Sequence, residues 1–187
     1  KVLFILPHDI EPFAQQPYGE TLVRARAYQN TFCSMAKSIG WTPTLFYLSN
    51  SEKKTRVIRH ADGYDIYKIP VLARVIGSSG CISPRLLAEV GKFIGKERPD
   101  IVHIHGYYTA MFEPLCLLLW QLKVPFVVNY HGSPLNRALR KLKRATLPFV
   151  LSKAKMILSP SRGELDVLKS WGVRVPMEFQ PNPVDMG

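Results

Sequence analysis

The chain has 187 residues, of which 47% are hydrophobic and 21% are charged, with 12 Gly, 15 Pro and only 3 Cys. These proportions are typical of a globular protein and exclude a disordered chain, a collagen-like repeat and a disulfide scaffold. The net charge of +11, from 25 Lys and Arg against 14 Asp and Glu, indicates an anionic partner such as a nucleotide or an acidic lipid.

The cysteines and the apolar runs bear on the location of the protein. Cys33, Cys81 and Cys116 are far apart and odd in number, which favours a reducing compartment. The longest strictly apolar run, residues 115–120, is much shorter than the roughly 20 residues that span a bilayer. We therefore expect no transmembrane or secretory segment and a cytoplasmic location.

The first half of the chain alternates between strand and helix patterns, and one predicted hairpin interrupts this alternation. Residues 2–6 form a continuous apolar run, which is typical of a strand buried on both faces. A helical pattern over residues 20–39 follows, and then a second strand over residues 44–48. In the predicted hairpin, two β-like runs flank the turn sequence at residues 61–63.

The second half repeats the alternation more regularly. Ser83 and Pro84 are suited to the N-cap and first position of a helix. Alternating strands and helices predict an α/β fold with a mainly parallel sheet and helices on both faces. The expected elements are a helix to about residue 97, a strand over 100–105, a helix over 110–122, a strand over 125–130, a basic helix after Ser133, a strand over 155–159 and a helix over 161–171.

Polar residues follow several of the predicted strands. Ligands of open parallel sheets bind at the carboxyl ends of the strands, where His105-Gly106, His131-Gly132 and Ser161 stand. A glycine allows a backbone amide to approach a ligand oxygen, and a helix N-terminus offers free N–H groups. Phosphate or sugar hydroxyls suit such an edge, although both His-Gly pairs are also compatible with plain strand-to-helix turns.

Other site chemistries have less support. His103 and His105 lie two apart on a strand and share a face, so with His131 they offer a metal site, but no fourth ligand is evident and we expect no metal. The sequence lacks a GxGxxG after the first strand, a GxxxxGK[ST] loop and a GxSxG elbow. Common P-loop and α/β-hydrolase sites are therefore excluded, and a Rossmann dinucleotide site has little support.

The positive charge is concentrated between residues 133 and 155, which carry seven Lys or Arg and no acidic residue. At 3.6 residues per turn, leucines and alanines form one stripe of a helix and cations the opposite side. Such a helix fits an anionic membrane surface, and equally a solvated face over an ordinary core helix. Without aromatic residues between the cations, we expect no nucleic-acid partner. The cationic side consists of Arg137, Arg140, Lys141 and Arg144.

The strand ends together resemble a known family. The motifs are residues 99–106, 125–132 and 157–161 with Glu164 and Leu168, followed by residues 171–173 and 181–185. The order of these motifs resembles that in the N-terminal, acceptor-side domain of retaining family 4 glycosyltransferases. The resemblance implies a Rossmann-like domain over residues 1–180, one half of a GT-B fold, and an interdomain hinge that starts at residues 181–187. It also implies transfer of a sugar from a nucleotide-sugar donor to an acceptor hydroxyl with retention of configuration and without a required metal or other cofactor.

The resemblance also implies site residues. The histidine of the second His-Gly motif, here His131, faces the donor sugar in that family, and His105, Gly106, Gly132, Ser161 and Glu164 are the other matching positions. The family's loop after the first strand holds two glycines and a glutamate. Here Gly19 and Glu20 match, but Tyr18 replaces the first glycine.

The family's second domain, which holds the nucleotide, is not in this sequence. We therefore expect weak or no transfer without this C-terminal partner domain. The acceptor is a sugar or a lipid-linked molecule, and the latter would place the protein peripherally on the inner face of the membrane. Two alternatives stay open, a noncatalytic module that binds a sugar or nucleotide and a sugar-nucleotide epimerase of the same GT-B fold.

Overall fold

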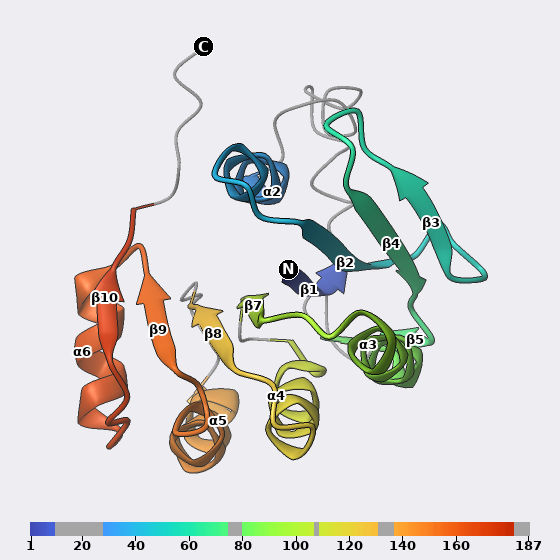
Figure 1. The fold of residues 1–187 in the computed structure, drawn as a ribbon. Helices are drawn as coiled ribbons and strands as arrows, with labels where there is room; N and C mark the ends of the chain where they lie inside the picture. The colour runs from blue at the N-terminus through green and yellow to red at the C-terminus, as the bar shows by residue number, and fades with distance from the viewer. Residues whose placement is uncertain (10–27, 75–79, 107–108, 131–136, 182–187) are drawn as a thin grey trace, which may run out of the picture.

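The computed structural model describes residues 1–9, 28–74, 80–106, 109–130 and 137–181. Within these residues the chain forms an eight-stranded sheet with the order β10-β9-β8-β7-β1-β2-β4-β3 and a separate two-stranded hairpin, β5-β6 (Figure 1). Every neighbouring pair of the large sheet is parallel except β3 and β4. The strands are β1 Val2–Asp9, β2 Pro43–Ser49, β3 Arg56–Arg59, β4 Asp65–Pro70, β5 Ala73–Arg74, β6 Cys81–Ile82, β7 Ile101–His105, β8 Phe126–Asn129, β9 Met156–Ser159 and β10 Met177–Phe179.

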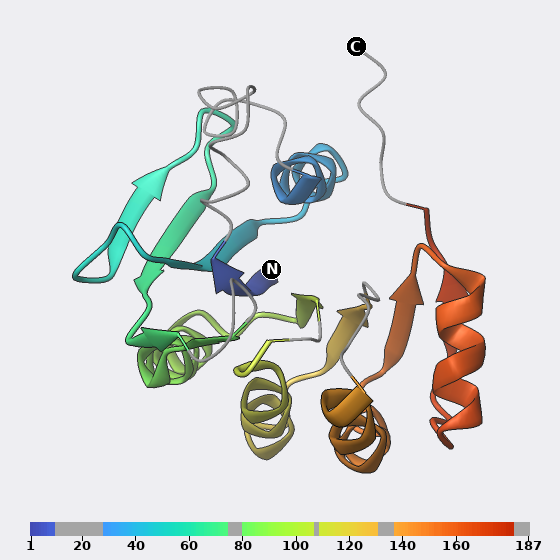
Figure 2. The ribbon, with the colours of Figure 1, turned by 180° about the vertical axis from the view of Figure 1, so that it is seen from behind.

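Five helices are described, and they cover both faces of the sheet. In Figures 1 and 2, α2 lies over one face, while α3, α4 and α5 lie side by side on the other, and α6 runs beside β9 and β10. This arrangement confirms the expected α/β, Rossmann-like fold. The helices are α2 Tyr28–Ser38, α3 Pro84–Glu97, α4 Phe112–Gln121, α5 Arg137–Leu151 and α6 Arg162–Ser170.

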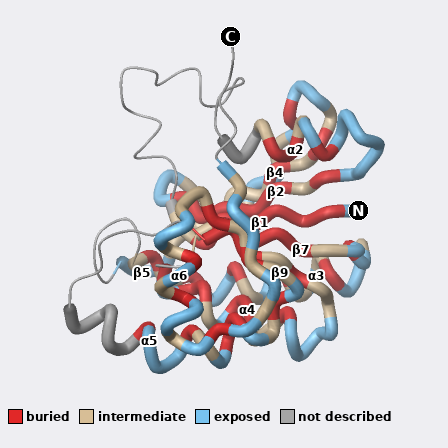
Figure 3. The backbone as a smooth tube through the Cα atoms, turned by 90° about the vertical axis from the view of Figure 1, so that its left-hand side faces the viewer, coloured by how far each residue is buried: buried red, intermediate tan, exposed pale blue. Residues whose placement is uncertain are grey.

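The central strands are buried on both faces, as their apolar sequences require. Residues 2–6 of β1 are each no more than 4% exposed, because alternate side chains enter two separate cores. Leu3 and Ile5 belong to the larger core under α3, α4 and α5, and Val2, Phe4 and Leu6 to the smaller one under α2. Figure 3 shows the buried residues gathered along β1, β2 and β7.

The turn and cap signals act largely as predicted. Gly63 adopts φ +80° in the β3–β4 hairpin, and Gly40 and Gly172 adopt φ +84° and +88° after α2 and α6. Ser83 is the N-cap of α3 and Pro84 is the first residue of the helix, but the Ser83 side chain makes no capping hydrogen bond. The Ser83 hydroxyl donates instead to the carbonyl of Pro70 at 2.7 Å, which ties the start of α3 to the end of β4.

The structure adds elements that the sequence patterns did not predict. β10 joins the sheet beside β9, and the backbone N–H of Gln180 continues this pairing to the Ser159 carbonyl at 2.9 Å. The hairpin of β5 and β6 has only two residues in each strand. Sheet pairing therefore reaches residue 180, while the domain boundary proposed there stays a prediction.

Candidate functional site

The order of the strands defines where a ligand of this fold binds. The chain places β2 on one side of β1, and later places β7 on the other side. The carboxyl ends of β1 and β7 therefore form a topological switch point, where helices of an open α/β sheet leave to opposite faces and a crevice opens. His8 near the end of β1 and His105 at the end of β7 stand at this point.

Gly106 and His8 bring the two strand ends into contact. Gly106 adopts φ +83°, a left-handed conformation that side chains disfavour, and its N–H donates to the Asn129 carbonyl at 2.9 Å. A Cβ at this position would lie 3.7 Å from Cε1 of His8. The first predicted His-Gly pair is therefore a tight strand exit, and the imidazole of His8 lies against it.

His105 lies inside an aromatic layer beneath α2. The ring centroids of His103 and His105 are 4.3 Å apart, which confirms that the two side chains share a face of β7. Phe4 and Phe32 flank the His105 ring with centroid distances of 6.0 and 5.0 Å, and His105 is only 2% exposed. His105 therefore packs in the core between aromatic rings, whereas its role in substrate binding stays a prediction.

Ser161 and Glu164 take part in a cap at the start of α6. The Ser161 hydroxyl accepts the N–H of Glu164 at 3.4 Å, as the N-cap position requires. The buried Ser159 hydroxyl donates to Oε2 of Glu164 at 2.7 Å and accepts the N–H of Ser161 at 3.1 Å. A carboxylate in the first turn also interacts favourably with the helix dipole. These polar groups stabilise the strand-to-helix turn, and their predicted substrate contact stays a prediction.

Four of the predicted site residues lie outside the residues that the structure describes. These are Gly19, Glu20, His131 and Gly132. Of the predicted edge, His105 and Gly106 after β7 and Ser161 after β9 lie at carboxyl ends of parallel strands, with β8 between them. Among the described residues, no group of three His, Cys, Asp or Glu side chains could hold a metal ion.

The basic run forms a helix as expected, but one of its cations turns inward. Lys143 is 8% exposed, and its ammonium is paired with Oε1 of Glu113 on α4. Leu147, Val150 and Leu151 place the apolar side of α5 in the larger core. Of the predicted cationic side, Arg144 is exposed, and Arg137, Arg140 and Lys141 lie in the first turns of α5, where side chains are not described.

An exposed aromatic pair beside this helix was missed by the sequence analysis. Nζ of Lys153 lies 4.9 Å from the ring centroid of Trp120 and 4.8 Å from that of Phe149. These rings are 49% and 57% exposed. Trp120 is on α4 and Phe149 on α5, so only the packing of the two helices brings them together. Residues 114–163, which contain both, carry nine Lys or Arg and no acidic residue.

The fold is a Rossmann-like lobe whose topological switch point lies at the carboxyl ends of β1 and β7. The model of Glycosyltransferase Family 4 matches residues 31–187, and the chain belongs to this family. No curated protein matches the sequence.

Solved structures share the fold at low sequence identity. Sucrose-phosphate synthase from Thermosynechococcus elongatus aligns with a TM-score of 0.64 and 14% identity over 97% of this chain and 48% of that one. OtsA aligns with a TM-score of 0.64 and 11% identity over 99% of this chain and 50% of that one. A putative UDP-N-acetylglucosamine 2-epimerase from Listeria monocytogenes aligns with a TM-score of 0.56 and 14% identity over 91% of this chain and 41% of that one. The chain thus spans about half the length of these GT-B proteins.

Proposed function

We propose that this chain is the N-terminal, acceptor-side lobe of a retaining glycosyltransferase, which transfers a sugar from a nucleotide-sugar donor to an acceptor hydroxyl. The observation that carries the proposal is the family match over residues 31–187 on a fold whose strand order places a switch point between β1 and β7. The family and fold are supported by the comparisons. Retention, the donor and the acceptor belong to the proposal.

In this mechanism the lobe contributes position and charge stabilisation. The acceptor attacks the face of the donor sugar that the leaving diphosphate vacates, and a donor phosphate oxygen accepts the acceptor proton. The protein then needs no nucleophile and no metal, and its task is to hold two substrates in the reactive geometry. His131 orients the donor sugar, with Gly132 allowing close approach. Gly19 and Glu20 lie near the donor diphosphate, and a second α/β lobe binds the nucleotide.

The decisive experiment is product analysis with the two-lobed enzyme and a panel of nucleotide sugars. We expect a glycoside with the anomeric configuration of the donor, and a His131→Ala turnover lower by more than about tenfold at an unchanged melting temperature. His60→Ala, in the β3–β4 hairpin, is the histidine control for turnover. An unchanged rate for His131→Ala removes this residue from the site. We expect the 187-residue chain alone to show weak donor binding and no efficient transfer.

An epimerase is the second candidate, because the Listeria epimerase shares the fold. The same assay separates the two functions. An epimerised nucleotide sugar formed without any acceptor contradicts the transferase. Binding without either product favours the noncatalytic module.

We also propose that the basic face of α5 contacts anionic membrane, which would bring a lipid-linked acceptor to the crevice. The exposed rings of Trp120 and Phe149 support this proposal, since aromatic side chains favour the interface between water and lipid. The structure has no helix, within the residues described, that is long and apolar enough to span a bilayer. The contact that we propose is peripheral.

Vesicle sedimentation tests the membrane proposal. Binding should rise with the fraction of phosphatidylglycerol in phosphatidylcholine vesicles and fall with salt, because the attraction is screened over about 10 Å at 0.1 M. Arg144→Glu should weaken binding, and Lys92→Glu on α3 is the matched charge reversal on another helix. Binding that is absent or insensitive to salt supports a merely solvated face.

A further inference from the structure

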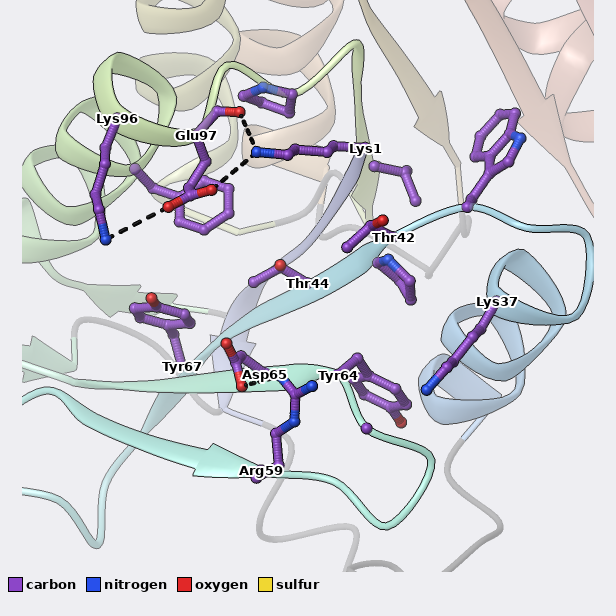
Figure 4. A pocket seen from close by; sticks show the side chains of 16 residues that line it. Lys1, Lys37, Thr42, Thr44, Arg59, Tyr64, Asp65, Tyr67, Lys96 and Glu97 are labelled. Atoms are coloured by element: carbon purple, nitrogen blue, oxygen red, sulfur yellow. Dashed lines mark hydrogen bonds and ion pairs between the residues drawn. The ribbon is translucent and has the colours of Figure 1, made fainter.

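A cavity of about 280 Å³ opens at the opposite end of the sheet from the switch point (Figure 4). It lies where β1, β2 and β4 begin, and its lining includes Val2, Thr44 and Asp65 from these three strands. A strand rises about 3.3 Å per residue, so the run from Val2 to His8 separates this cavity from the crevice by roughly 20 Å. The proposed transfer reaction makes no use of it.

Two groups of ion-paired side chains face each other across the cavity. On one side, Nζ of Lys1 donates to Oε2 of Glu97 at 3.0 Å, and Nζ of Lys96 lies 3.4 Å from Oε1 of the same carboxylate. On the other side, Nη1 of Arg59 donates to Oδ1 of Asp65 at 2.7 Å. The cavity therefore offers both strong donors and strong acceptors from each side.

Hydroxyl groups and a fixed aromatic ring lie between these pairs. Figure 4 shows Thr44 and Tyr67 between the Lys96–Glu97 pair and Arg59. The Tyr67 ring stacks on Phe46 with centroids 4.3 Å apart. Burial and the charge of Asp65 raise the pKa of Tyr67, so its hydroxyl is a donor at neutral pH. The hydrogen bond from Lys1 lowers the pKa of Glu97, so this side chain is an ionised acceptor.

The charges argue against a phosphate ligand. Three of the four cations in the lining are paired with Asp65 or Glu97, whose carboxylates would repel a dianion, and the fourth, Lys37, donates to a backbone carbonyl. The helices α2 and α3 also end here, and helix C-termini carry partial negative charge, which Lys37 and Lys96 in their last turns complement. A neutral ligand that both donates and accepts hydrogen bonds meets neither obstacle.

We propose that this cavity is a second saccharide site, which binds one neutral pyranose ring. The vicinal hydroxyls of a pyranose can donate to Asp65 and Glu97 and accept from Arg59 and Lys96. Its C–H groups carry partial positive charge and suit the negative face of an aromatic ring, which Trp41 exposes at 48% on the lining. The volume is near the lower end of small-molecule sites, about 300–1,000 Å³, so it accommodates one ring.

The test is amide chemical-shift mapping on the 187-residue chain. The probes are the methyl pyranosides of glucose, galactose and mannose, with glycerol and inorganic phosphate as controls. We expect at least one pyranoside to shift the amides of Thr44, Asp65, Tyr67 and Glu97. Tyr67→Phe, which keeps the ring, and Lys96→Ala should each weaken binding by about threefold to tenfold, the usual effect of one hydrogen bond. Lys92→Ala, on the same helix but away from the cavity, should leave binding unchanged.

The other outcomes of the mapping would overturn the second saccharide site, and each can be told apart from a failure of the proposed transferase function. If none of the pyranosides shifts these amides, or if glycerol shifts them equally, the cavity is no saccharide site. Shifts with phosphate alone would identify an anion site instead. Shifts confined to Gly106 and Ser161 would support sugar binding at the carboxyl-end edge, and thus the proposed function, while removing the second site. Conversely, cavity binding by an enzyme that fails to transfer sugar would leave this inference standing.

Discussion

The two edges of the sheet use polar side chains differently. At the carboxyl-end edge, hydrogen bonds link Ser159, Ser161 and Glu164 to one another and cap the first turn of α6. At the amino-end edge, Arg59 and Lys96 are 66% and 83% exposed, and their ion pairs border a cavity. Buried hydrogen bonds contribute to stability, whereas exposed ion pairs contribute little and can exchange partners. The comparison therefore predicts that substitutions in the Ser159–Glu164 turn affect folding, whereas substitutions in the ion pairs of the amino-end edge affect ligand binding at the cavity more than folding.

The largest expected effect is at Ser159. Ser159→Ala leaves the Glu164 carboxylate and the Ser161 N–H without their buried partner, so we expect a loss of about 2–3 kcal/mol in the free energy of unfolding. For a chain of this size the melting temperature should fall by about 5–10 °C, which thermal unfolding measures. Ser170→Ala, at the end of α6, is the control, because the hydroxyl of Ser170 donates to the Val167 carbonyl in an exposed position. Equal effects of the two substitutions would contradict the contrast between the edges.

An intermediate effect is expected at Gly106. Gly106→Ala forces a side chain into φ +83° against His8, which should cost about 1–2 kcal/mol. Gly91→Ala is the control, and we expect it to change the free energy of unfolding in the opposite direction. Gly91 lies in α3 with open space around it, so alanine should stabilise the helix by about 0.5–1 kcal/mol. Denaturant unfolding of both variants checks the sign of each change. A Gly106→Ala variant as stable as the parent would show that the strand exit is adaptable.

The smallest effect is expected at Glu97, on the amino-end edge. Its pKa is below the ordinary value of 4.5 because Lys1 donates to it and adds positive charge. Its stabilising contribution is therefore present above pH 4.5 and is lost as the pH falls through the lower, folded-state pKa. Glu97→Gln should lower the melting temperature slightly at pH 7 and not at low pH, and so flatten this part of the acid limb of the melting-temperature profile. Glu178→Gln, at an exposed carboxylate of β10, is the control. A large loss of stability for Glu97→Gln at pH 7 would show that this edge, too, stabilises the fold.

The sequence predicted those elements whose pattern is local. The apolar run of β1, the hairpin glycine at position 63 and the proline at the start of α3 each act within a few residues, and all three are confirmed. β10 was missed because its three residues are half-buried or exposed and lack an apolar pattern. They form a strand because the edge of β9 supplies hydrogen-bonding partners.

The candidate site was predictable only in part, for the same reason. Position after a strand placed His105, Gly106 and Ser161 at one edge, since parallel strands end together. The contact of His8 with Gly106 depends on strand order, which no local pattern encodes. The cavity joins residues from four strands and two helices, and the Trp120–Phe149 pair joins two helices, so neither leaves a signal in the sequence.

The antiparallel strand β3 has a consequence for how the protein behaves in concentrated solution. Among the strands that the structure describes it is the outermost, so the backbone groups on its outer side could recruit the same strand of another molecule. Its four residues begin and end with exposed arginines, Arg56 and Arg59, around the half-exposed Val57. Two copies pairing antiparallel here would crowd four guanidinium groups and disturb their ion pairs with Glu52 and Asp65, so the charged ends of this short strand disfavour polymerisation.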